Sequence, residues 1–305
     1  MFRILVDLIK LSGTPPSIIY PYPIFAMLVF SFSGVFDIIY LFRAISISFL
    51  FCAGINLWNH VNDIDEDILT GKRNVLVENP KVRSITPVIA LLLYLSSFLL
   101  TILWTVDKRG IAAFIVVAIV TWIYSDKMTI GKKIRRWKEH YITEVTTYLI
   151  SIPAFTLLLW TLFAPLSLRC FALAIIMTFF MLSGTFLKDI KDITGDKLAG
   201  LKTLGVVFPP ESLLKISFIL LGFYYLFVSI FSLSGLFPVF CIASNISSLG
   251  LVYTISHFLN NNWNITLESV KPVKVMVFSN LTSLIILILL NVFIQTPELS
   301  QFHLS

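Results

Sequence analysis

Repeated apolar segments of about 20 residues constrain this chain more than any other feature of its sequence. An α-helix of that length crosses ~30 Å of hydrocarbon and satisfies its own backbone polar groups in lipid. The segments do not alternate polar with apolar residues, as the strands of a membrane β-barrel do. The sequence therefore predicts an all-α, polytopic membrane protein. We expect a single domain over 1–305, with about nine transmembrane helices around a central cavity and with cytoplasmic Asp-rich loops. The nine predicted spans lie near 17–36, 39–60, 84–105, 110–124, 142–163, 168–188, 213–234, 236–259 and 272–293.

Lysine and arginine residues are distributed unevenly over the predicted loops. Of the 23 such residues, 19 fall on the side of the N-terminus and four on the other side. Because cytoplasmic loops are enriched in these residues, we place the N-terminus and the long loops 61–83, 125–141 and 189–212 in the cytoplasm. The same bias explains the net charge of +6 without a nucleic-acid partner. Three separated cysteines in apolar sequence predict neither a disulfide framework nor a zinc site.

Two acidic clusters follow predicted spans and contain six of the ten Asp residues in the chain. In NHVNDIDED, Asn59, Asp63 and Asp67 share one face if the helix continues, because they are four residues apart. Asp192 and Asp196 repeat that spacing in LKDIKDITGDK. Hard oxygen ligands suit Mg²⁺, which often bridges carboxylates to substrate phosphates; the alternative is a pair of solvated helix ends. We predict Mg²⁺ ligation by Asn59, Asp63, Asp192 and Asp196, with Asn56, His60, Asp67 and Asp189 around them.

The first cluster resembles the first motif of the UbiA superfamily of intramembrane prenyltransferases, which has the form NDxxDxxxD. Asn59, Asp63 and Asp67 match that form, while His60 stands where the family usually has Asp. A register that starts at Asn62 would place a threonine at the last position, so we prefer the register that starts at Asn59. The histidine leaves the identity of the acceptor substrate open.

The second cluster resembles the DxxxD motif of the same family and the residues that follow it. Asp192 and Asp196 are followed by Lys197, Gly200 and Thr203 in a GDKxxGxKTL pattern. This form favours the branch that resembles geranylgeranylglyceryl phosphate synthases over the hydroxybenzoate branch. The resemblance covers most of the chain. It implies nine spans, a cytoplasmic N-terminus, Mg²⁺ as cofactor, and transfer of a prenyl group from a prenyl diphosphate to a lipophilic acceptor.

The residues and the resemblance together indicate a headgroup pocket at the cytoplasmic ends of the spans. Cleavage of a prenyl diphosphate leaves negative charge on the diphosphate, which metal ions and cationic side chains stabilise. The predicted catalytic residues are Asp63, Asp67, Asp192, Asp196 and Lys197. The predicted diphosphate contacts are Lys72, Arg73, Tyr124, Lys127, Lys133, Lys188, Lys191 and Lys202.

Other functions share some of these features. An ether-lipid glycerol phosphate, an aromatic ring, a porphyrin-type alcohol and, in a membrane terpene cyclase, water all stay open as acceptors. A CDP-alcohol phosphotransferase would need Asp-Gly and Ala-Arg pairs, which the chain lacks. A cation transporter would carry its acidic residues near the bilayer midplane, whereas both clusters here lie at predicted span ends. We expect prenyl diphosphate, the acceptor and membrane lipid as partners.

Overall fold

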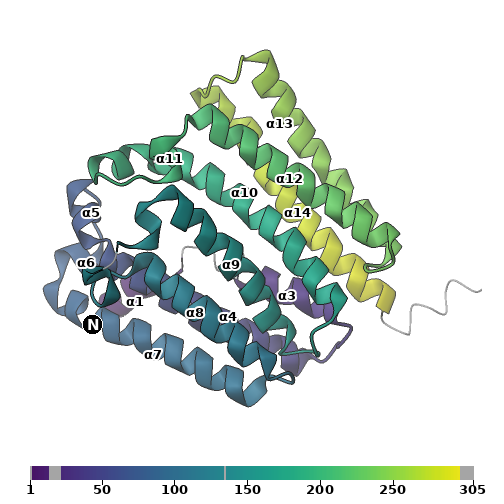
Figure 1. Cartoon of the computed structure of the whole chain (residues 1–305), viewed down its shortest axis with the longest axis horizontal. Helices are drawn as coiled ribbons and strands as arrows, with labels where there is room; N and C mark the ends of the chain where they lie inside the picture. Colours follow the sequence, from purple (N-terminus) through teal and green to yellow (C-terminus); the bar gives the residue numbers. More distant parts are fainter. Residues whose placement is uncertain (1, 14–21, 134, 296–305) are drawn as a thin grey trace, which may run out of the picture.

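The computed structural model describes residues 2–13, 22–133 and 135–295, and its named elements are all helices (Figure 1). Within this described part, the extended pairing is one isolated bridge between His140 and Lys202. The predicted all-α class is therefore confirmed. The α-helices are α1 (Phe2–Ser12), α3 (Tyr22–Ser33), α4 (Ile38–Asn62), α5 (Ile64–Leu69), α6 (Val75–Glu78), α7 (Pro80–Trp104), α8 (Arg109–Ser125), α9 (Tyr141–Trp160), α10 (Leu168–Leu198), α11 (Leu204–Val207), α12 (Pro210–Leu233), α13 (Ser248–Asn260) and α14 (Val270–Gln295). The 3₁₀ helices are η1 (Ile130–Lys132), η2 (Trp137–Glu139), η3 (Val239–Ser247) and η4 (Leu267–Ser269).

Seven helical segments of the described chain are long and apolar enough to cross a membrane. They are Ile38–Asn62, Pro80–Trp104, Tyr141–Trp160, Leu168–Leu198, Pro210–Leu233, Val239–Asn260 and Leu267–Phe293. Two other predicted spans coincide with shorter helices, since α3 has 12 residues and α8 has 17. At about 1.5 Å per residue, α8 is roughly 26 Å long, which is less than ~30 Å of hydrocarbon. The prediction of nine full spans is therefore not confirmed, and residues 17–21 of the first predicted span lie outside the described residues.

Successive long helices pack side by side, and the last helix returns to α3 near the start of the chain. Contacts join α4 to α3 and α7, α9 to α8 and α10, and α10 to α12. At the end of the chain α13 packs on α14, which also contacts α3. Figure 1 shows α7 and α13 at opposite edges of this arrangement, with α9 and α10 between them.

An aromatic cluster joins the helices that carry the first acidic cluster to their neighbours. Phe51 of α4 contacts Tyr94, Phe114 and Phe155, with ring centroids 5.3, 5.2 and 5.7 Å away. Phe25 of α3 contacts Phe155 at 5.4 Å. Aromatic pairs at such distances add about 0.5–1.5 kcal/mol each beyond the burial of their area. The cluster therefore holds α3, α4, α7, α8 and α9 together beside the acidic segments.

The first acidic cluster lies on a broken helix. α4 ends at Asn62, Asp63 has φ −102° and ψ 8°, and α5 begins at Ile64. The expectation that Asn59, Asp63 and Asp67 share a continuous helix is therefore wrong. Asp63 caps the end of α4, and Asp67 lies on α5.

The second acidic cluster lies within a helix. We expect the span to end near Lys188 and a loop to follow, but α10 continues to Leu198. Asp189, Asp192 and Asp196 therefore occupy the last three turns of α10. Because these carboxylates project from a regular helix, their spacing is set by its geometry, whereas the spacing of the first cluster depends on the break at Asp63.

Candidate active site

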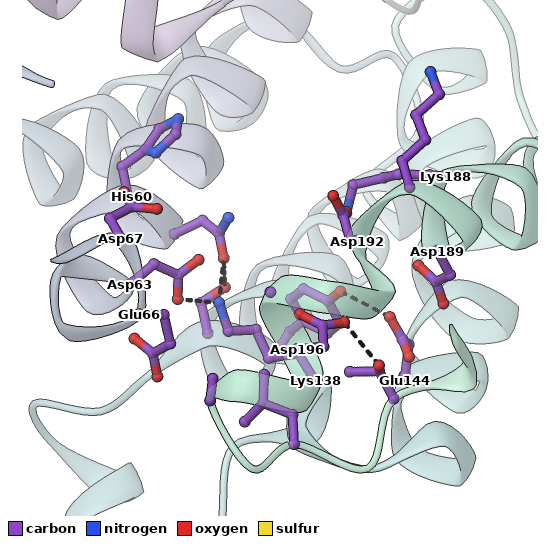
Figure 2. Close-up of a pocket in the computed structure, with 18 of the residues that line it drawn as sticks. His60, Asp63, Glu66, Asp67, Lys138, Glu144, Lys188, Asp189, Asp192 and Asp196 are labelled. Atoms are coloured by element: carbon purple, nitrogen blue, oxygen red, sulfur yellow. Dashed lines mark hydrogen bonds and ion pairs between the residues drawn. The ribbon is translucent and has the colours of Figure 1, made fainter. Parts of the chain in front are cut away.

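A cavity of about 750 Å³ brings the two acidic clusters together (Figure 2). Its walls come from α4, α5, α8, α9 and α10 and from the segments that follow α5 and α10. Figure 2 shows Asp63 and Asp67 on one wall and Asp189 and Asp192 on the other. Twelve predicted site residues line the cavity: Asn56, Asn59, His60, Asp63, Asp67, Lys72, Tyr124, Lys188, Asp189, Lys191, Asp192 and Asp196.

Asn59 and Asp63 share a cationic partner, Lys138 of η2. The Nζ atom of Lys138 donates to Asn59 Oδ1 at 3.0 Å and also to Asp63 Oδ1. Ser125 Oγ donates to the same Asn59 oxygen at 2.7 Å. Burial lowers the pKa of Lys138, and the negative charge of Asp63 opposes that effect. The predicted metal ligands of the first cluster thus hold a lysine ammonium group between them.

Arg136 is a buried cation beside the first cluster, with a side chain only 2% exposed. Its guanidinium donates to Asp63 Oδ1 at 3.1 Å, to Glu66 Oε1 at 2.5 Å and to Glu139 Oε1 at 2.6 Å. It also donates to the backbone oxygen of Asn62 at 3.2 Å. Removing one partner of a buried ion pair leaves an uncompensated charge. The network therefore holds the 126–140 segment against the end of α4.

The sequence does not single out Arg136 and Lys138. Both lie in the basic segment between Ser125 and Tyr141, where our prediction names Lys127 and Lys133 instead. The density of basic residues is a signal that the segment approaches the acidic motifs. Which of those residues does so depends on how the segment folds, because no helical or strand period relates them.

Asn62 and Asn59 play different parts in the structure, which bears on the register of the first motif. Asn62 is buried, its side chain donates to Trp58 O at 2.7 Å, and it accepts from Lys127 N at 2.7 Å. Asn59 instead lines the cavity. The register that starts at Asn59 is the one that places its asparagine at the cavity.

Asp67 is 5% exposed and is held by the turn that follows α5. Asn74 Nδ2 donates to Asp67 Oδ2 at 2.9 Å, and Lys72 Nζ lies 3.6 Å from Oδ1. Asn74 Oδ1 also accepts from two backbone amides at the start of α6. Asp67 therefore connects α5 to α6 as well as lining the cavity.

The second cluster has fewer cationic partners than the first. Lys188 Nζ lies 3.5 Å from Asp192 Oδ2, and both side chains are partly exposed. Thr203 Oγ1 donates to Asp196 Oδ2 at 2.7 Å. Asp189 is 3% exposed, and its Oδ2 atom has no hydrogen-bond partner among the described residues. This wall of the cavity thus presents carboxylate oxygens that the described chain leaves incompletely satisfied.

Glu144 is a cavity residue that our sequence prediction misses. It lies in the first turn of α9 and is 3% exposed. Tyr124 Oη donates to Glu144 Oε1 at 3.4 Å, and Leu204 N donates to Oε2 at the same distance. Figure 2 shows Glu144 on the side of the cavity that carries Asp189. A lone acidic residue in an apolar helix is a sequence signal of a functional role, but the spacing of Glu144 in the sequence does not link it to either acidic motif.

Five predicted residues lie outside the cavity lining: Arg73, Lys127, Lys133, Lys197 and Lys202. Lys127 pairs with Asp65 at 2.6 Å, and this hydrogen bond lowers the pKa of Asp65. Lys202 bonds through its backbone to residues 139 and 141. Lys133 and Lys197 are exposed. The catalytic role of Lys197 and the diphosphate contacts of the other four residues stay predictions.

Asn56 and His60 both line the cavity on α4. Asn56 Nδ2 donates to Ser12 O at 2.9 Å and to Tyr22 Oη at 2.5 Å. Asn56 therefore ties the end of α1 and the start of α3 to α4. These hydrogen bonds give Asn56 a structural role next to the predicted metal ligands.

Comparison with known proteins places this fold in a family. The model of the UbiA prenyltransferase family matches residues 20–281. An uncharacterized protein of Archaeoglobus fulgidus is 35% identical over 288 residues, which cover 92% of this chain and 96% of that protein.

Solved structures show the same fold at low identity. A digeranylgeranylglyceryl phosphate synthase has a TM-score of 0.65 and 15% identity, over 94% of this chain and 98% of its own. A UbiA homolog from Archaeoglobus fulgidus bound to DMAPP and Mg²⁺ has a TM-score of 0.59 and 15% identity, over 92% and 99%. A UbiA homolog from Archaeoglobus fulgidus bound to GPP and Mg²⁺ has a TM-score of 0.55 and 16% identity, over 92% of this chain and 99% of its own. The seven apolar helices agree with a membrane location, and the chain belongs to the UbiA prenyltransferase family.

Proposed function

We propose that this protein transfers a prenyl group from a prenyl diphosphate to a lipophilic acceptor in the membrane. The observation that carries the proposal is the cavity whose two walls bear the acidic motifs, with the lysines of both walls beside them. Family membership supports the reaction class. Fold neighbours bound to DMAPP or GPP with Mg²⁺ support a prenyl diphosphate as donor.

The donor atoms of the cavity fit Mg²⁺. Asn59, Asp63, Asp192 and Asp196 offer hard oxygen ligands, and a buried oxygen of Asp189 lacks a partner among the described residues. In the described chain no group of three or more His, Cys, Asp or Glu side chains converges to hold a metal by itself. This suits an ion that keeps waters and binds substrate phosphate oxygens as well. Bound Mg²⁺ would supply Lewis-acid stabilisation of the departing diphosphate.

Cationic side chains of the chain bind the diphosphate in this proposal. Lys72, Lys188 and Lys191, which the sequence predicts as diphosphate contacts, line the cavity, and Lys138 lines it too. Lysine acts on phosphate as a point charge with three donors. Lys138 exchanges its bonds to Asn59 and Asp63 for phosphate oxygens when the substrate enters. The position of Lys138 between the two acidic clusters supports this role.

The proposal also includes the orientation of the protein. We place the N-terminus, both acidic clusters and the 126–140 segment on the cytoplasmic side of one membrane-embedded domain. The excess of lysine and arginine on that side supports this orientation.

The test incubates membranes containing the protein with radiolabelled geranylgeranyl diphosphate, Mg²⁺ and a panel of acceptors. The panel contains a prenylated glycerol phosphate, 4-hydroxybenzoate and a long-chain alcohol. We expect a labelled lipid product with at least one acceptor and none after chelation of the metal. A labelled cyclic hydrocarbon formed without acceptor would instead indicate a terpene cyclase. If the diphosphate is not consumed under any condition, the proposed function is rejected.

A further inference from the structure

Glu144 is a buried carboxylate in the cavity wall that neither acidic motif contains. It is 3% exposed although it lines the cavity, and no described lysine or arginine forms an ion pair with it. Its two hydrogen bonds, from Tyr124 Oη and from Leu204 N, are both 3.4 Å long. Hydrogen bonds of that length are weak, because good N–H···O and O–H···O bonds are about 2.7–3.2 Å. The carboxylate oxygens of Glu144 can therefore accept further hydrogen bonds that the described chain does not supply.

The charged groups around Glu144 include two carboxylates, which makes its buried negative charge unfavourable without further hydrogen-bond donors. On α10, Asp189 and Asp196 repel the charge of Glu144, and Lys188 attracts it. Asp189 is 3% exposed, with its Oδ2 atom unpartnered among the described residues. Burying a carboxylate without a hydrogen-bond donor or counter-charge is unfavourable. A ligand that supplies donors would satisfy both the unpartnered Asp189 oxygen and the weakly bonded Glu144 carboxylate on this wall.

Two tyrosine hydroxyls connect Glu144 with the cavity. Tyr124 Oη lies 3.2 Å from Tyr148 Oη, and both residues line the cavity beside Glu144. Thr147 and Ser151 extend the hydroxyl-bearing surface along α9. This wall suits a neutral polar group that can both donate and accept hydrogen bonds.

We infer that Glu144 is the catalytic base that takes the proton of an alcohol acceptor, an inference that rests on the proposed prenyl transfer. The acceptor hydroxyl donates to Glu144, while Tyr124 and Tyr148 orient its oxygen. The oxygen forms a bond to C1 of the prenyl group, and its proton passes to Glu144. The bond from C1 to the diphosphate oxygen breaks, and its electron pair leaves with the diphosphate. The product is a prenyl ether.

The chemistry of the acceptor explains why the inference names an alcohol. An alcohol oxygen is a weak nucleophile until a base removes its proton, and such a base contributes about 10²- to 10⁴-fold in rate. An electron-rich aromatic carbon attacks before any proton leaves, so it has less need of a buried carboxylate. Glu144 therefore selects a lipid with a free hydroxyl as the substrate class.

The first test compares Glu144→Gln with the wild-type protein. Glutamine has the same shape and can still accept from Tyr124, but it takes no proton. We expect prenyl transfer to the prenylated glycerol phosphate to fall by about 10²- to 10⁴-fold. Binding of a prenyl thiodiphosphate in the presence of Mg²⁺ should stay at the wild-type level. The matched control is Glu211→Gln, since Glu211 is an exposed glutamate paired with Lys215 outside the cavity, and it should change neither quantity.

Chemical rescue separates a catalytic role from a structural one. Glu144→Ala should lose transfer in the same way and recover part of it when formate is added, because formate replaces the missing carboxylate. Transfer to the alcohol at the wild-type rate in Glu144→Gln, or equal loss of thiodiphosphate binding, would overturn the inference. Wild-type transfer to the aromatic acceptor alone would overturn the alcohol assignment while leaving the proposed function intact.

Discussion

The two acidic clusters carry similar sequence patterns but have different electrostatic environments. Asp63 contacts the guanidinium of Arg136 and the ammonium of Lys138, and both cations are largely buried. Across the cavity, Asp189 has an unpartnered oxygen among the described residues, and Asp192 has a partly exposed lysine at 3.5 Å. The first cluster therefore has buried protein cations beside it, although Glu66 Oε2 is also unpartnered among the described residues. The second depends more on ligands that enter the cavity.

This difference suggests a division of labour between the clusters. A buried cation network can hold the first cluster in place before substrate binds, because its ion pairs are shielded from water. The exposed end of α10 can accept cations without first displacing a buried partner.

Replacing Arg136 should have the largest effect on stability. Arg136→Met leaves Asp63, Glu66 and Glu139 without their shared buried cation, so we expect a loss of about 3–5 kcal/mol in the free energy of unfolding. The comparison variant is Lys188→Met, whose exposed i, i+4 pair with Asp192 accounts for about 0–1 kcal/mol, so its loss should be smaller than that of Arg136→Met. Denaturant unfolding in detergent measures both. Equal losses would show that the two clusters are not differently compensated.

Removing a predicted metal ligand from either cluster should abolish most turnover. Asp63→Asn and Asp192→Asn each remove a charge that the transition state uses, so we expect a loss of about 10²- to 10³-fold in rate. Only the Asp63 variant should also lower the unfolding temperature, since it leaves Arg136 with fewer partners. The measurements are labelled prenyl transfer and thermal unfolding. Near wild-type transfer in either variant would show that the residue is not a ligand.

Metal and diphosphate should bind cooperatively, because each relieves the repulsion that the other meets. A coupling of about 1–3 kcal/mol would tighten diphosphate binding by roughly 5- to 150-fold when Mg²⁺ is present. Calorimetry with a prenyl thiodiphosphate, with and without Mg²⁺, measures this coupling. Lys138→Met sharpens the comparison, since it should increase the affinity for Mg²⁺ alone by removing a competing cation from Asn59 and Asp63. Equal diphosphate affinities with and without Mg²⁺ would contradict a bridging ion.

Both clusters should face the same side of the membrane. Thr70 and Thr194 line the cavity near the first and second clusters, so single cysteines at these positions should react with an impermeant maleimide only from the cytoplasmic side. The labelling is measured in sealed and in opened cells, with the unmodified chain as the control for its own cysteines. Reaction from outside in sealed cells would refute the proposed orientation.

Much of the local structure could be predicted because it depends on neighbours in the sequence. The apolar segments predicted helices, and Asp192 and Asp196 could be placed on one face because a regular helix sets their relation. The break at Asp63 was not predictable from spacing, since the same residues fit a continuous helix. Helix lengths such as the 17 residues of α8 likewise differ from windows of apolar sequence.

The sequence by itself determined the helical membrane class, the two acidic motifs and twelve of the residues that line the cavity. Only the tertiary structure decided which further cationic and acidic side chains lie beside the acidic motifs in the cavity. Arg136 reaches Asp63 across 73 positions of chain, and Leu204 reaches Glu144 across 60. Such partners have no periodic relation in sequence, because they meet only where helices and the 126–140 segment pack. The charge balance of the cavity is therefore a property of packing, whereas the relation between Asp192 and Asp196 follows from local helical spacing.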